Sequence, residues 1–285
     1  MPGVQQRRDA DAGRDRLTVT LDPEAGALAL DEREVLARFA QRVPLRGSVV
    51  VEVGGCMPAD AVRAAGVARW LAVDPVNDPA TARPPVAAVG GCASTIPLED
   101  SSADAAFSCN AFQHVGPLED VLDELHRVLR PGGRVYASFG PVWSAPDGSH
   151  VENLVVGGQR YDFWTSSLLP AWAHLVLAPD ELEEMVRDRH GPQLATALAA
   201  WVSESEWINR LPLHRLLEIV DARELELEAV RGCREFGYDF APPDIQSPWS
   251  ERLAPAAVAA HAWAAYGIPA EHLPIRDVEL ELRCP

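Results

Sequence analysis

Two short stretches of the sequence carry residues suited to holding a nucleoside. The apolar run SVVVEV contains Glu52 and is followed directly by Gly54 and Gly55. Asp74 comes 20 residues after Gly54 and closes a second apolar run, ARWLAVD. Glycine lets the backbone approach a ligand, and a carboxylate at this spacing accepts hydrogen bonds from ribose hydroxyls. An aspartate before Pro75 can also cap a turn, so both roles stay open for Asp74.

The glycine turn departs from the spaced G-x-G-x-x-G pattern of dinucleotide sites, because Cys56 and Pro58 stand where later glycines are expected. A pyrophosphate-binding turn needs that spacing, so the sequence disfavours a nicotinamide dehydrogenase. Two interpretations of the turn remain open. Gly55 takes over the missing glycine's role and Pro58 begins the next helix, or the site no longer binds a nucleoside.

The composition excludes several kinds of chemistry and of partner. All 25 basic residues are arginine, which rules out a Schiff-base lysine and a P-loop lysine. The formal net charge of −17 disfavours nucleic acid and anionic membranes as partners. The five cysteines form no CxxC pair, so we expect no metal site and no disulfide framework. With no signal-peptide pattern and no apolar run long enough to span a membrane, we expect a cytoplasmic protein.

Alternating strands and helices must position these residues. Strands are predicted at 48–53, 68–74, 85–91, 103–110, 132–140, 223–232 and 275–284, and helices at 31–43, 58–66, 117–130, 179–189, 191–202 and 254–265. This order predicts an α/β fold, a Rossmann-like seven-stranded, mostly parallel sheet with helices on both faces. Because the carboxyl ends of parallel strands meet at one edge, we expect the ligand there.

The run ASTIPLEDSSADAAFSCNAFQHVGPLEDVLDELHRVLRPGGRVYASFG, residues 93–140, resembles the class I S-adenosylmethionine-dependent methyltransferases, particularly those that act on small molecules. The E-x-x-R-V-L-R-P-G-G segment and the His-Val helix opening carry most of the likeness. The resemblance covers residues 48–140 well and the terminal strands weakly.

The resemblance implies S-adenosylmethionine as the cofactor. It assigns cofactor contacts to Glu52, Gly54, Gly55, Asp74, Cys92, Ala93 and Asn110. Cys92 is a departure, because the family commonly has an acidic or polar contact to adenine at this place. The implied organisation is a flexible segment at 1–25, the cofactor-binding core at 26–140, a substrate-binding or lid region with helices at 141–222, and terminal strands with a helical insertion at 223–285.

Methyl transfer is an in-line displacement, so the protein mainly aligns the acceptor and, for a hydroxyl, removes its proton. Without lysine the base should be a histidine, an aspartate or a glutamate, and the candidates selected are His114, His150 and His174. Seven of the eight tryptophans lie beyond residue 140, and Trp143, Trp164 and Trp172 are the candidate substrate contacts. Each of these residues also fits a purely structural role.

Two hypotheses on function follow. The first is O-methylation of a small, rather apolar acceptor in natural-product biosynthesis, by a protein that binds no nucleic acid and no membrane and that forms a homodimer. The second keeps the fold but not the reaction, with an eroded cofactor site serving a cyclase, an isomerase or a non-catalytic partner subunit. The methylated atom is not fixed by the sequence, since oxygen, nitrogen and carbon acceptors use the same alignment.

Overall fold

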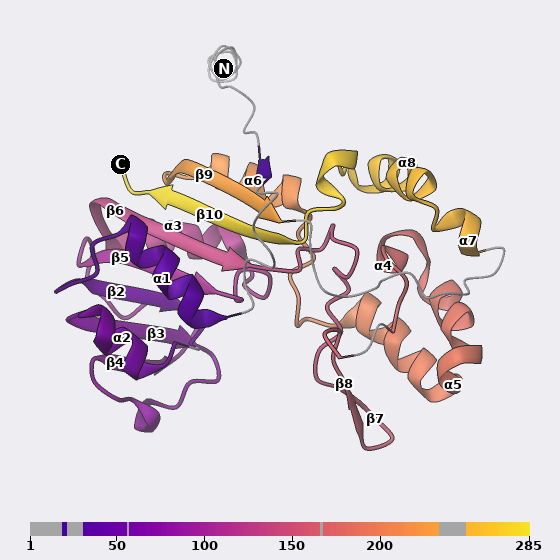
Figure 1. Cartoon of the computed structure of the whole chain (residues 1–285), viewed down its shortest axis with the longest axis horizontal. Helices are drawn as coiled ribbons and strands as arrows, with labels where there is room; N and C mark the ends of the chain where they lie inside the picture. The colour runs from indigo at the N-terminus through magenta and orange to yellow at the C-terminus, as the bar shows by residue number, and fades with distance from the viewer. Residues whose placement is uncertain (1–18, 22–30, 56, 166–167, 234–248) are drawn as a thin grey trace, which may run out of the picture.

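The computed structural model describes residues 19–21, 31–55, 57–165, 168–233 and 249–285. An 8-stranded sheet contains six strands from the first half of the chain and two from its C-terminal part (Figure 1). Its strands are β1 (Thr20–Leu21), β2 (Val49–Val53), β3 (Arg69–Asp74), β4 (Val86–Gly90), β5 (Ala103–Cys109), β6 (Leu129–Phe139), β9 (Glu226–Cys233) and β10 (Asp277–Arg283).

The strand order is β1-β9-β10-β6-β5-β2-β3-β4, and every pairing is parallel except the two made by β10. This confirms the expected mostly parallel, doubly wound sheet. All seven predicted strands are present, and the two-residue β1 adds an eighth that the sequence pattern did not indicate. It falls within the segment expected to be flexible, most of which lies outside the described residues.

Helices cover both faces of the sheet. They are α1 (Glu32–Arg42) and α2 (Ala59–Ala65) on one face, and α3 (Leu118–Val128) and α6 (Leu213–Asp221) on the other. Phe39 of α1 packs with the buried rings of Trp70, Phe107 and Tyr136, while Leu122 of α3 belongs to the core on the opposite face. Strands buried on both faces explain why SVVVEV is apolar without alternation.

The second half of the chain builds a helical part beyond one end of the sheet (Figure 1). It contains α4 (Ala173–Val176), α5 (Pro179–Glu204), α7 (Trp249–Arg252), α8 (Pro255–Tyr266) and the hairpin of β7 (Leu154–Val156) and β8 (Gln159–Tyr161). Short 3-10 turns cover Pro79–Thr81 and Ala270–His272. The two helices expected at 179–189 and 191–202 form α5, which is kinked at Gly191, where φ is 77° and Pro192 follows.

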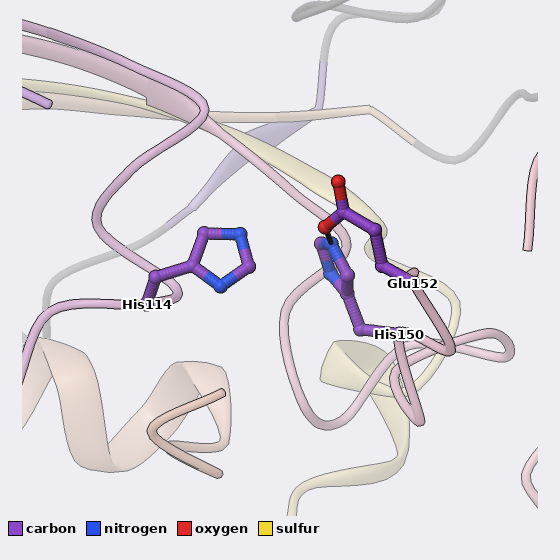
Figure 2. A group of neighbouring side chains, drawn as sticks. All are labelled: His114, His150 and Glu152. Atoms are coloured by element: carbon purple, nitrogen blue, oxygen red, sulfur yellow. Dashed lines mark ion pairs between the residues drawn. The ribbon is translucent and has the colours of Figure 1, made fainter. Parts of the chain in front are cut away.

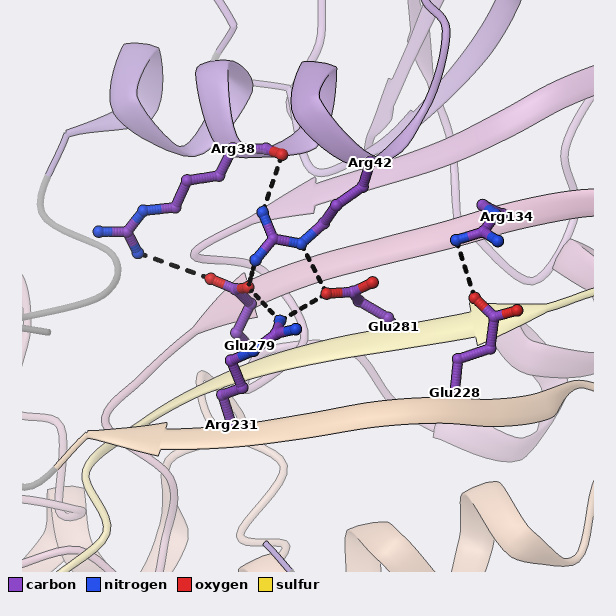
Figure 3. Close-up of polar contacts among 7 residues, drawn as sticks. All are labelled: Arg38, Arg42, Arg134, Glu228, Arg231, Glu279 and Glu281. Atoms are coloured by element: carbon purple, nitrogen blue, oxygen red, sulfur yellow. Dashed lines mark hydrogen bonds and ion pairs between the residues drawn. The ribbon is translucent and has the colours of Figure 1, made fainter. Parts of the chain in front are cut away.

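An ion-pair network ties α1 to the strand that closes the sheet. Glu279 of β10 is 2% exposed, and its Oε1 lies 2.5 Å from Nη2 of Arg42 and 2.8 Å from Nη1 of Arg231 (Figure 3). Arg42 also reaches Glu281 at 2.6 Å. The alternation in DVELELR places the acidic residues on the α1 face and Val278, Leu280 and Leu282 in the opposite core.

Candidate active site

A cavity of about 450 Å³ lies where β5 and β6 end, between the sheet and the helical part of the chain. Its walls are Glu32, Asn110, Gln113, His114, Gly140, His150, Glu152, Phe163, Trp164 and Arg276. This volume falls within the range of roughly 300–1,000 Å³ usual for small-molecule sites. The cavity therefore occupies the edge at which a ligand was expected.

Three ionisable side chains meet in this cavity. The candidate ligand atoms of His114, His150 and Glu152 all lie within 4.8 Å of one another, and Figure 2 shows the three side chains facing each other. The rings of the two histidines are 4.8 Å apart and nearly perpendicular. Nε2 of His150 lies 3.3 Å from Oε2 of Glu152. Sequence reasoning selected both histidines but not the glutamate.

Trp207 holds two members of this cluster in place. Its backbone carbonyl lies 2.6 Å from Nδ1 of His114, and its indole N–H donates to Oε2 of Glu152 at 2.9 Å. Because a carbonyl only accepts, Nδ1 of His114 must be the protonated nitrogen, which leaves a lone pair on Nε2. The same reasoning makes Nε2 of His150 the donor to Glu152, so its lone pair is on Nδ1.

Burial sets the protonation of the cluster. It lowers the pKa of His114 to about 4, with help from the neighbouring His150, so this imidazole is neutral at pH 7. Burial also raises the pKa of Glu152, but the hydrogen bonds from His150 and Trp207 outweigh it and the pKa stays below its ordinary value. The cluster thus presents neutral imidazole and carboxylate to the cavity.

Backbone strain marks the same walls. Asn110 has φ of 52° and His150 has φ of 46°, in the left-handed region that residues other than glycine seldom adopt. Non-glycine residues held in this region tend to occur at functional sites, because the surrounding structure must compensate for their cost. Asn110 follows β5, and its N–H donates to the Ser138 carbonyl of β6 at 2.8 Å.

A buried, ion-paired arginine also lines the cavity. Arg276 precedes β10, is 3% exposed, and donates to Asp147 at 2.9 Å and to Asp277 at 2.6 Å. Its guanidinium also lies 5.6 Å from the centre of the Phe163 ring. Carboxylates within the wall therefore balance its charge. Arg276 was not among the residues selected from the sequence.

The glycine turn after β2 is built so that two glycines are needed. Gly54 has φ of 96°, and a Cβ at this position would come within 2.9 Å of the Ala111 Cβ. A Cβ on Gly55 would meet the side-chain amide of Asn77 at 2.6 Å. Cys56 lies outside the described residues. The glycines thus keep the backbone close to the loops that follow β3 and β5.

Glu52 lies beneath this turn. It is 1% exposed, and its carboxylate accepts the Met57 N–H at 3.0 Å and the Trp70 indole N–H at 2.6 Å. Met57 packs into the apolar core with α1 and α2 and does not line the cavity. Glu52 therefore shapes the turn through the backbone of Met57.

Asp74, Cys92 and Ala93 come together at the ends of β3 and β4. The Asp74 carbonyl accepts the Gly91 N–H, and its half-buried carboxylate accepts the Val76 N–H on Oδ1 at 2.9 Å. The turn-capping role is therefore real, but it leaves Oδ2 without a hydrogen-bond partner in the described part of the chain. Cys92 is exposed and Ala93 is buried.

Three residues predicted as bases or substrate contacts, His174, Trp143 and Trp172, do not line this cavity. His174 is 5% exposed, its Nε2 lies 2.8 Å from the Trp143 carbonyl, and burial lowers its pKa to about 4. Trp143 packs with it in the core of the helical part. The Trp172 indole N–H reaches the carbonyls of Ser144 and Leu273. The contacts described for these three side chains lie within the helical part and its adjoining loops, and their roles at a ligand site stay predictions.

Trp164 is the one proposed substrate tryptophan that lines the cavity. It is 37% exposed, and its ring meets Phe163 edge to face with centres 4.9 Å apart. Phe163 in turn lies 4.6 Å from the His150 ring. Sequence reasoning missed Phe163 as well as Glu152, although both lie between the selected residues His150 and Trp164.

Comparison with known proteins agrees with the first half of the chain. Residues 51–137 match the family described as methyltransferase domain. An uncharacterized methyltransferase of Mycobacteroides abscessus is 32% identical over 160 residues, which cover 49% of this chain and 59% of that protein. One from Mycobacterium tuberculosis is 40% identical over 81 residues, 27% of this chain and 31% of the relative.

Among solved structures, an S-adenosylmethionine-dependent methyltransferase from Mesorhizobium loti aligns over 88% of this chain and 97% of its own, with 16% identity and a TM-score of 0.47. The domain match and the curated relatives place residues 51–137 in the class I S-adenosylmethionine-dependent methyltransferase family. The chain spans about three fifths of the length of the Mycobacteroides abscessus relative. No described helix is long and apolar enough to cross a membrane.

Proposed function

We propose that this protein transfers a methyl group from S-adenosylmethionine to a hydroxyl of a small-molecule acceptor. The observation that carries the proposal is the cavity at the carboxyl ends of β5 and β6, directly beside the family-matched segment and lined by histidines and a glutamate. In α/β sheets of this kind, ligands bind at that edge. Family membership implies the cofactor, and the cavity supplies a place for the acceptor.

The residues at the cofactor edge fit an adenosyl group. Oδ2 of Asp74 is available for a ribose hydroxyl, and Gly54 and Gly55 keep the neighbouring backbone free of side chains. Asp74 also acts electrostatically on His114, which lines the cavity. Asn110, which follows β5, also lines the cavity. When bound, S-adenosylmethionine supplies an electrophilic methyl group on a sulfonium.

The cavity can accept the proton that O-methylation releases. The acceptor oxygen forms a bond to the methyl carbon, its proton passes to a base, and the carbon–sulfur bond breaks with its electrons staying on sulfur. His114 offers a lone pair on Nε2 and His150 one on Nδ1, and Glu152 orients the second ring. We assign the base to this cluster and no longer to His174, which lies outside the cavity.

Residues 141–222 form the acceptor side of this proposed site. Residues 141–151 are buried throughout and form the buried wall segment of the site, of which His150 lines the cavity. The Val142 N–H donates to the carbonyl of Arg276, the residue before β10. The exposed hairpin of β7 and β8, with Trp164 beside it, is the part that can close over an acceptor. The aromatic rings of Phe163 and Trp164 favour an acceptor with apolar or aromatic surface, as in natural-product biosynthesis.

Calorimetric titration with S-adenosylmethionine tests the proposal. We expect wild-type protein to bind it and Asp74→Ala to bind it about 10- to 100-fold more weakly, because a hydrogen bond to a charged group contributes about 1.5–3 kcal/mol. Asp74→Asn keeps an acceptor for the Val76 N–H and tests whether the charge itself matters. Asp78→Ala is the matched control, since Asp78 only caps the neighbouring turn.

The competing hypothesis predicts another result. If the wild-type chain binds neither S-adenosylmethionine nor S-adenosylhomocysteine, the methyltransferase proposal fails. The fold would then serve a cyclase, an isomerase or a non-catalytic partner.

A further inference from the structure

We infer that His114, His150 and Glu152 form a binding site for one divalent first-row transition-metal cation. Two imidazoles and one carboxylate are the ligand set of catalytic zinc sites and of non-haem iron(II) sites. The three residues come from two different loops, one after β5 and one after β6, and they face a cavity rather than closed core. Water or an acceptor oxygen can therefore complete the coordination.

The distances suit such an ion. Around a four-coordinate cation with bonds of about 2.1 Å, neighbouring ligand atoms lie roughly 3.4 Å apart. Nε2 of His150 and Oε2 of Glu152 are 3.3 Å apart, and no separation between the candidate ligand atoms exceeds 4.8 Å. A movement of the His114 ring by about 1 Å, well within side-chain rotation, would bring all three atoms to bonding distance.

Trp207 supplies the outer support that metal ligands usually have. Histidine ligands typically donate their second ring N–H to a carbonyl or carboxylate, and ligating carboxylates are themselves hydrogen-bonded. Here the Trp207 carbonyl receives Nδ1–H of His114 and its indole N–H donates to Glu152. Figure 2 shows that the His114 ring is turned toward His150 and Glu152, so its Nε2 lone pair faces the cluster.

The His150 ring is held in the cluster at a cost. His150 is 3% exposed, and its buried Nδ1 has no hydrogen-bond partner in the described part of the chain. A buried polar atom without a partner is costly, and a cation bound through Nε2 would leave Nδ1 as the protonated nitrogen, a donor for water. The backbone of His150 is also strained, with φ in the left-handed region. The surrounding structure therefore holds this ring in place despite the strained backbone and the unpartnered Nδ1.

The surrounding charges permit a cation. The positive charge of Arg276 in the same cavity is balanced by Asp147 and Asp277, and Glu32 adds a carboxylate to the lining. With a cation bound, the three side chains would serve as ligands, the cation would polarise the acceptor hydroxyl, and the proton would pass to water in the cavity. The base role proposed above applies to the metal-free cluster. Cysteine spacing in the sequence cannot indicate this site, because its three residues include no cysteine.

Metal binding is testable without any acceptor. The full chain is freed of metal with a chelator and titrated with Zn²⁺ by calorimetry and with Co²⁺ by visible absorption. We expect one Zn²⁺ per chain, at least about 100-fold weaker binding in His150→Ala and Glu152→Gln, and about 10-fold weaker binding in Trp207→Phe. His126→Ala, on the surface of α3, is the control and should bind as the wild type does.

The result that overturns the inference is the absence of stoichiometric binding by wild type, or equal affinity in the site variants and the control. Glu152 and Trp207 are partly exposed, so their variants remain informative if His150→Ala does not fold. The inference goes beyond the proposed function, and titration of the metal-free protein with S-adenosylmethionine separates the two. A chain that binds this cofactor but not Zn²⁺ disproves the cation site alone.

Discussion

At the scale of residues, His150 and His174 differ in their surroundings. His150 lines the cavity with one ring nitrogen lacking a described partner, whereas His174 is enclosed by the helical core and satisfied by the Trp143 carbonyl. Their sequence contexts look alike, since each follows a Trp-containing loop. Burial and hydrogen bonding, rather than residue type, decide which one can meet a ligand.

The buried His174 should make the protein sensitive to acid. Its folded-state pKa of about 4 lies below the ordinary 6.5, so the unfolded chain binds the proton more readily. Stability from this group is complete above pH 6.5 and is lost as the pH falls toward 4, by about 2 kcal/mol at pH 5. His174→Gln keeps an N–H donor for the Trp143 carbonyl but does not titrate.

Urea unfolding of both proteins at several pH values between 7.5 and 4.5 measures this effect. The free energy of unfolding should fall more steeply in the wild type than in His174→Gln. His261→Gln, on α8, is the control and should follow the wild-type profile. Parallel profiles for wild type and His174→Gln would show that the buried imidazole does not cause the acid sensitivity.

At the scale of elements, ion pairs connect α1 to β9 and β10, which are far from it in sequence. Arg42 of α1 and Arg231 of β9 converge on Glu279 of β10, which is almost fully buried (Figure 3). A buried carboxylate depends on its partners, because desolvation is costly when they are removed. The network therefore fixes α1 against the antiparallel strand that ends the chain.

Arg42→Met tests this element-scale role. The methionine keeps most of the apolar stem but leaves Glu279 with only the more exposed Arg38 and Arg231 among its described ion-pair partners. We expect a loss of about 1–2 kcal/mol in the free energy of unfolding, at the low end because Arg42 is 22% exposed. Arg187→Met removes an exposed pair on α5 and should cost less than about 0.5 kcal/mol. Equal losses in the two variants would contradict the assignment.

At the scale of the whole molecule, the cavity lies between a sheet whose central strands fall within the methyltransferase-domain match and a helical part with its own apolar core. The segment that joins them begins as the buried wall at 141–151 and continues into the exposed hairpin of β7 and β8. This arrangement limits where closure can occur, because packed residues with internal hydrogen bonds open rarely.

Hydrogen exchange with and without S-adenosylmethionine tests that division. We expect slower exchange over 153–165 when the cofactor is bound, and little change over 142–151, because that stretch is already buried in the free protein. Helix α8, away from the cavity lining, is the internal control. Slowing of the wall to the same extent as the hairpin would show that the segment moves as one lid, and no change at 153–165 in saturated protein would exclude closure there.

The sequence by itself determined most of the sheet and its helices. Apolar runs such as SVVVEV, and helical stripes such as Leu118, Val121, Leu122 and Leu125, are local patterns whose period fixes the element and its buried face. Asp74, Asn110, His114 and His150 could be selected because they follow predicted strands, and parallel strands end at one edge. The antiparallel direction of β10 carried no such local signal.

Only the tertiary structure decided which of the selected side chains meet. His114 and His150 are separated by 36 residues, and their convergence with Glu152 depends on the path of two loops and on Trp207, which lies farther along the chain. The same long-range packing encloses His174 and Trp143 in the helical core. Local periodicity determines elements because their contacts are near in sequence, whereas a site in loops depends on contacts between distant residues that periodicity does not encode.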